Sequence, residues 1–141
     1  NNWGISLGNL ARTKEEKESE ELYKQAFDKF RKAIKIKPDF HEAFDNWGTD
    51  LGNLAKTKQG GESEKLYNQA FEKFKKAIEF GASSYNLSCI YALKNDKEKA
   101  FKFLNVCLKN DEINIDIVEK DKDWLYYLKD KEFIELLRSY Q

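Results

Sequence analysis

The chain has 141 residues, which is enough for one domain of ordinary size. Its 25 Lys and Arg residues balance 25 Asp and Glu residues, so it lacks the basic excess that general nucleic-acid or membrane-surface binding requires. No apolar run approaches the roughly 20 residues of a membrane span.

The cysteine content also limits the class of protein. Two cysteines, Cys89 and Cys107, fit neither a disulfide framework nor a zinc site, and we expect both to be reduced and buried in a cytoplasmic protein. The chain begins at Asn1 and enters a repeat at once, so we expect it to be a piece of a longer protein.

A sequence repeat with a shift of 44 residues organises the first half of the chain. Held at that shift without gaps, residues 3–36 match residues 47–80 at 22 of 34 positions. Trp3-Gly4 recurs as Trp47-Gly48, and the segments Leu-Gly-Asn-Leu-Ala and Gln-Ala-Phe occur in both copies. Such periods are typical of helical repeat proteins, in which each unit is one supersecondary element.

The first unit, residues 1–38, is predicted to contain two helices. Ser19 is a candidate N-cap for the second helix, and Pro38 lies just past its end, where a missing N–H does no harm. The apolar residues of that helix follow a 3.6-residue period with charge on the opposite face; they are Leu22, Tyr23, Ala26, Phe27, Phe30, Ala33 and Ile34.

The second unit, residues 39–80, repeats this pattern. Gly60-Gly61 separates its two helices, and Ser63 is the candidate N-cap of the second one. We expect Trp47 and Phe74 to be buried and Ala33 and Ala77 to lie at close helix contacts. The apolar stripe of its first helix comprises Phe40, Ala43, Phe44, Trp47, Leu51, Leu54 and Ala55.

The third unit, residues 81–112, departs from the 44-residue spacing. Gly81 is expected to end one helix in a left-handed conformation, and Ser83 or Ser84 to cap a short following helix. Asn95 and Glu98 have the spacing of a capping box before a further helix, in which Leu104 should be buried.

Residues 113–141 are predicted to close the domain. Asp130 is a candidate cap for a final short helix whose apolar residues would cover the last exposed face; these residues are Phe133, Ile134, Leu137 and Tyr140.

Several spacings resemble those of the tetratricopeptide repeat (TPR) family. Ala26, Phe30, Ala33 and Pro38 have the spacing of the small, aromatic, small and proline positions in the second TPR helix. The large and small positions of the first helix of the next repeat are matched by Phe44, Trp47, Gly48 and Leu51. A period of 44 carries an insertion of about ten residues relative to the standard repeat, at the turn between the helices.

The tail resembles the end-of-group module that closes bacterial TPR proteins. The resemblance implies a single all-α domain over residues 1–141, a right-handed α-α superhelix of the TPR-like solenoid type with about seven helices. It also implies that the first helix of each pair lines the concave side.

No residue pattern predicts catalysis, a cofactor or a metal site. The only histidine, His41, has no serine or cysteine nucleophile at helical spacing and is expected to be an exposed helix-start residue. The acidic pairs alternate with lysines, as on a solvated surface. We therefore predict a chain that is not an enzyme.

The TPR register implies which residues face a partner. Asn side chains can bond a peptide backbone as both donor and acceptor, while Glu42 and Asp45 would make the concave surface acidic and favour a basic or amide-rich segment. The candidate partner-binding residues are Asn9, Glu42, Asp45, Asn46, Thr49, Asn53, Tyr85 and Asn86.

Two functions follow as hypotheses. The first is a scaffold that binds a partner protein or peptide on the concave helical surface. The alternative is a structural or self-assembling repeat segment of a larger protein whose activity lies elsewhere. The chaperone-tail clamp of some TPR domains is disfavoured, because residues 39–55 contain no Lys or Arg.

Overall fold

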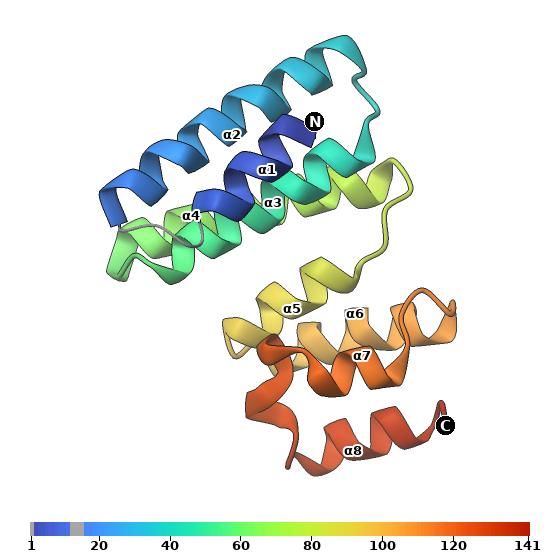
Figure 1. Ribbon diagram of the computed structural model, residues 1–141. Coiled ribbons are helices and arrows are strands. Elements are labelled where there is room, and N and C mark those ends of the chain that lie inside the picture. The colour runs from blue at the N-terminus through green and yellow to red at the C-terminus, as the bar shows by residue number, and fades with distance from the viewer. Residues whose placement is uncertain (1, 12–15) are drawn as a thin grey trace. The chain divides into compact units, whose positions relative to one another are not determined.

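The computed structural model describes residues 2–11 and 16–141, and every regular element within these ranges is a helix (Figure 1). The predicted all-α class is therefore confirmed. Nine helical segments lie in the described ranges, rather than about seven, because the closing segment is divided into three short helices instead of one.

The chain forms two compact units, the first ending at Ala82 and the second spanning Ser83–Gln141. Within the described residues, no helix combines the length and the apolar character that crossing a membrane requires.

The first unit consists of two helical hairpins. The first hairpin pairs α1 (Asn2–Ala11) with α2 (Glu16–Ile36), and the second pairs α3 (His41–Lys56) with α4 (Gly60–Glu79). The packing of α2 against α3 joins the two hairpins. Lys58, in the turn after α3, adds an ion pair to Glu20 of α2 with 2.8 Å between Nζ and Oε2.

The core of the first unit lies where α1, α2 and α3 meet. Ala26, Phe30 and Ala43 are fully buried there. Small residues at such positions let helices approach closely while large ones fill the grooves between them. Phe74 is buried, as predicted, whereas Trp47 is only half-buried because one side of its ring faces a groove.

Two further expectations for this unit have mixed outcomes. Ala77 is fully buried, but Ala33 is only half-buried. Ser19 and Ser63 do not cap α2 and α4, since each helix begins three residues earlier. The Ser63 hydroxyl instead donates to the backbone oxygen of Ala55 at 2.9 Å and ties the start of α4 to the end of α3.

The second unit begins after a left-handed turn. Gly81 has φ +102° and follows the end of α4, as predicted. The next helix, α5 (Tyr85–Leu93), has 9 residues against 16 in α3, which confirms a short first helix. α5 packs against α6 (Lys97–Lys109), whose N-cap is Asp96 rather than the predicted Asn95.

The closing segment supplies most of the second core. It comprises α7 (Ile115–Lys120), the 3-10 helix η1 (Lys122–Tyr127) and α8 (Lys131–Arg138). Trp124, Tyr127 and Phe133 are buried against Leu104 of α6. Asp130 caps α8 by accepting from the Phe133 N–H at 3.2 Å, as the sequence predicts.

Candidate functional site

The polar residues predicted on the helix after Pro38 do share one face of α3. Positions 42, 46, 49 and 53 are separated from their neighbours by three or four residues, which places them on the same side of a helix, and position 45 lies three residues from 42 and four from 49. Glu42 is exposed, whereas the other four are half-buried: Asp45, Asn46, Thr49 and Asn53. The Thr49 hydroxyl donates to the backbone oxygen of Asp45 at 3.0 Å, so it is occupied within the helix.

The remaining predicted residues lie elsewhere. Asn9 is exposed on α1, at the position that corresponds to Asn53 of α3 under the 44-residue shift. Tyr85 and Asn86 are half-buried on α5 in the second unit. The Tyr85 hydroxyl donates to Asp121 Oδ2 at 2.8 Å, so it holds α5 to the closing segment and is not available to a partner.

A different surface of the first unit has the shape of a binding site. It is a groove of about 310 Å³ over the half-buried side of Trp47, and we call it the Trp47 groove. Helices α2, α3 and α4 provide its lining, which consists of Phe27, Arg31, Trp47, Leu51, Gln69, Glu72 and Lys73.

Aromatic rings form the floor of the Trp47 groove. The Phe27 and Trp47 rings are stacked with 6.1 Å between their centroids, and Leu51, with 3% of its surface exposed, lines the same groove. Phe27 belongs to the first hairpin and Trp47 to the second. The groove therefore exists only because the two hairpins pack against each other.

Two cations stand beside this floor. Lys73 Nζ lies 3.7 Å from the centroid of the Trp47 ring, and the Arg31 guanidinium carbon lies 5.7 Å from it. Arg31 is paired with Asp28, whereas Lys73 forms no ion pair with any described residue. Burial, and then the nearby charge of Arg31, lowers the pKa of Lys73 below its ordinary value.

This arrangement favours an apolar ligand that carries a negative charge. The indole face attracts a cation through its quadrupole, which keeps Lys73 at the groove, and a carboxylate would relieve the repulsion between Lys73 and Arg31. Indole and guanidinium groups are also the side chains most enriched at the centres of protein interfaces.

The sequence-based prediction missed the groove, although the repeat contains a signal for it. In the first hairpin, Lys29 Nζ lies 4.8 Å from the centroid of the Trp3 ring. Lys29 follows Trp3 by 26 residues, and Lys73 follows Trp47 by the same number. The recurrence of a Trp–Lys pair in both copies could have indicated a cation–π contact between the two helices of each hairpin. Arg31 could not have been added in this way, because it approaches Trp47 from the other hairpin.

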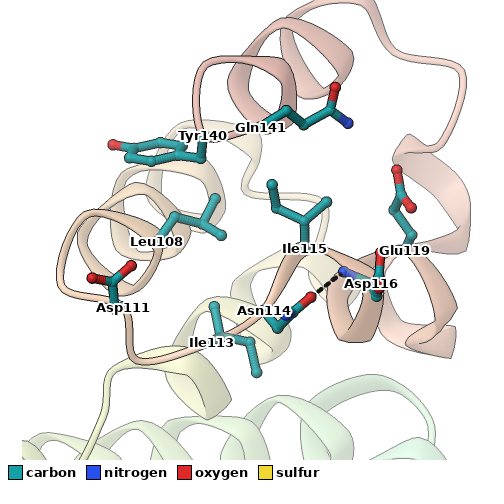
Figure 2. Close-up of a pocket in the computed structure, with 9 residues that line it drawn as sticks. All are labelled: Leu108, Asp111, Ile113, Asn114, Ile115, Asp116, Glu119, Tyr140 and Gln141. Carbon is teal, nitrogen blue, oxygen red and sulfur yellow. Dashed lines mark hydrogen bonds between the residues drawn. The ribbon is translucent and has the colours of Figure 1, made fainter.

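The second unit contains a pocket of about 380 Å³ with an acidic rim (Figure 2). Ile115 projects between Leu108 and Gln141, while Asp116 and Glu119 lie on one side of the pocket and Asp111 on the other. Asn114 Oδ1 accepts from the Asp116 N–H at 2.8 Å and fixes the start of α7. All three acids are exposed, as is usual for solvated surface groups.

A partly buried cluster joins α5 to the start of η1 in the same unit. The thiol of Cys89 and carboxylate oxygens of Asp121 and Asp123 lie within 4.8 Å of one another. Both oxygens of Asp121 already accept hydrogen bonds, Oδ1 from the Asp123 N–H at 2.9 Å and Oδ2 from the Tyr85 hydroxyl.

The electrostatics of this cluster favour a structural role. Burial, and then the charges of Asp121 and Asp123, raise the pKa of the Cys89 thiol well above its usual range. A protonated thiol is a poor ligand and a poor nucleophile. We therefore interpret the cluster as a hydrogen-bonded cap that holds the closing segment.

Comparison with known proteins adds no further constraint. No protein-family model, curated protein or solved structure matches the chain. Its function is therefore inferred from the geometry of its own residues.

Proposed function

We propose that this chain is a protein-interaction module of the helical-repeat class, with its hairpins arranged as a TPR-like right-handed superhelix. Its role is to bind a segment of a partner protein. This proposal is supported by the 44-residue sequence repeat and by the similar helical hairpins that the two copies form.

The single observation that carries the proposal is the half-buried Lys73 above the Trp47 ring. A lysine in this position loses part of its hydration, as its lowered pKa indicates, and gains no carboxylate among the described residues in return. A carboxylate of the partner would offset the lost hydration by forming an ion pair with Lys73. The partner would also cover the exposed part of the indole.

The partner segment that fits this groove places a carboxylate beside an apolar side chain. The apolar group would contact Trp47 and Phe27, and the carboxylate would lie between Lys73 and Arg31. Charge-assisted bonds of this kind are stronger than neutral ones. The Trp47 groove would thus bind an acidic segment, whereas the polar face of α3 favours a basic one. The charge of the bound peptide therefore distinguishes the two surfaces.

Peptide selection on the intact chain tests the proposal. Twelve-residue peptides would be selected from a random phage-displayed library at low and moderate salt, and their affinities measured by isothermal titration calorimetry. We expect selected peptides to combine acidic with apolar residues. Lys73→Gln should weaken their binding about tenfold, the equivalent of roughly 1.4 kcal/mol.

The repeat provides a matched control. Lys29 has the same relation to Trp3 as Lys73 has to Trp47, so Lys29→Gln should leave the affinities unchanged. The double variant Glu42→Lys/Asp45→Lys tests the polar face of α3 in the same assay. Binding that is lost in that double variant but kept in Lys73→Gln would refute the Trp47 groove as the binding site.

A further inference from the structure

The two hairpins of the first unit form the same internal contacts. A Cβ atom on Gly4 would lie 2.8 Å from Phe30 Cε1, and one on Gly48 would lie 2.8 Å from Phe74 Cε1. Each glycine therefore lets an aromatic ring of its own hairpin approach the helix backbone. With the Trp–Lys pairs, this makes α1 the counterpart of α3 and α2 the counterpart of α4.

One face of α3 is covered by the hairpin that precedes it. Trp47 stacks on Phe27 and Phe30, with centroid separations of 6.1 Å and 6.4 Å. Asp50 packs against Gly8 of α1 so closely that a Cβ atom there would collide with its carboxylate. Asp50 and Leu51 are both buried as a result.

No hairpin within the described residues covers the corresponding face of α1. Trp3 takes the position of Trp47 and is 71% exposed. Ser6 takes the position of Asp50 and is exposed, and Leu7 takes that of Leu51 and is half-buried. Tryptophan and leucine therefore occupy the same two positions of this face in α1 and in α3. Both residues are more exposed in α1 than in α3.

An exposed indole on such a face needs an explanation. In stacked repeats an outer surface that faces water is polar, and α1 presents a tryptophan instead. The chain itself shows what covers an equivalent face, namely the two helices of a preceding hairpin. The covering side chains are aromatic residues three positions apart followed by a basic residue, Phe27, Phe30 and Arg31.

We propose that the face of α1 formed by Trp3, Ser6 and Leu7 is an interface for a helical hairpin of the same repeat type. That hairpin would present two aromatic side chains and one basic side chain to Trp3, in the arrangement that Phe27, Phe30 and Arg31 present to Trp47. This interface is separate from the Trp47 groove and does not depend on the function proposed for it.

A chain extended by one repeat tests this interface. An added copy of residues 1–44 would be joined directly to Asn1, so that Phe44 of the copy precedes Asn1-Asn2-Trp3 as it precedes Asp45-Asn46-Trp47 in the native chain. Both proteins would be labelled with 5-fluorotryptophan, with each ¹⁹F resonance assigned by a Trp→Phe variant. The solvent isotope shift of each resonance reports the exposure of that indole.

We expect the solvent isotope shift of Trp3 to fall in the extended chain to the value for Trp47. Ser6→Arg gives the matched control, because Ser6 is exposed in the native chain but would occupy the position of the buried Asp50 in the extended one. This substitution should leave the native chain unchanged and restore the exposure of Trp3 in the extended chain.

Two results would overturn the proposal. The first is a fully exposed Trp3 in an extended chain whose circular dichroism shows that the added hairpin is helical. The second is an extended chain in which Ser6→Arg leaves the solvent isotope shift of Trp3 unchanged, since the added hairpin would then not lie on this face.

Discussion

At the scale of single residues, burial rather than sequence motif determines the chemistry. Cys89 and Tyr85 both have pKa values raised above their usual ranges, first by burial and then by neighbouring charge. Asp121 accepts from Tyr85 and caps η1, so one carboxylate fixes two elements. The Cys89 thiol and the Tyr85 hydroxyl therefore stay protonated and have a structural role.

The raised pKa of Cys89 predicts a pH dependence of stability. Below pH 9.0, the ordinary pKa of a thiol, both the folded and the unfolded chain hold the proton. As the pH rises beyond that value, the unfolded chain ionises first, so the free energy of unfolding falls by up to about 1.4 kcal/mol per pH unit for this group.

Urea denaturation at pH 8, 9, 10 and 10.5 measures this effect. The free energy of unfolding of Cys89→Ala should decline less steeply than that of the wild-type chain above pH 9.0. Comparing the two slopes removes the contribution of the other titrating groups. Parallel declines in the two proteins would contradict a buried, protonated thiol.

At the scale of elements, the helices follow the hydrophobic period and their ends follow tertiary contacts. α2 and α4 begin three residues before the predicted caps, and Ser63 is used to bond the end of α3 instead. Asp130, by contrast, caps α8 as predicted. The second oxygen of Asp130 pairs with Lys97 of α6 at 2.8 Å, so a contact to a neighbouring helix does not prevent this carboxylate from capping.

The contact between α3 and α4 predicts opposite effects for two glycine substitutions. Gly48→Ala should destabilise the chain by about 1–3 kcal/mol, because its Cβ would meet Phe74 in a packed core. Gly61→Ala makes the same chemical change at the exposed start of α4, where a Cβ would meet nothing within 4 Å. That variant should be more stable by about 0.4–1 kcal/mol.

Urea denaturation followed by circular dichroism would measure both variants against the wild-type chain. Equal changes in the free energy of unfolding would mean that α3 and α4 do not approach each other as closely as the Gly48–Phe74 contact requires.

At the scale of the whole molecule, position in the repeat determines the environment of each side chain. Trp3 and Trp47 share flanking sequence and helix position, yet one is 71% exposed and the other is half-buried between hairpins. The Trp47 groove likewise exists because Phe27 and Arg31 come from a neighbouring hairpin.

This difference predicts unequal costs for the same substitution. Trp47→Ala should lower the free energy of unfolding by about 2–3 kcal/mol, somewhat below the range for a fully buried tryptophan. Trp3→Ala should lower it by less than about 1 kcal/mol, as is usual for an exposed position. Chemical denaturation of the two variants measures both costs, and a loss at Trp3 as large as that at Trp47 would show that α1 is covered.

The sequence by itself determined the helical class, the 44-residue repeat and the approximate helices, because these follow from the local period of apolar residues and from turn residues such as Gly81. It also identified α3 residues that share a face, since helical spacing fixes their direction. Only the tertiary structure decided that the closing segment divides into three helices and that Tyr85 bonds Asp121. Only the tertiary structure brought Arg31 and Lys73 together at Trp47. The physical reason is that exposure and charge pairing depend on which hairpin packs against a face, and identical local sequence can face either a neighbour or water.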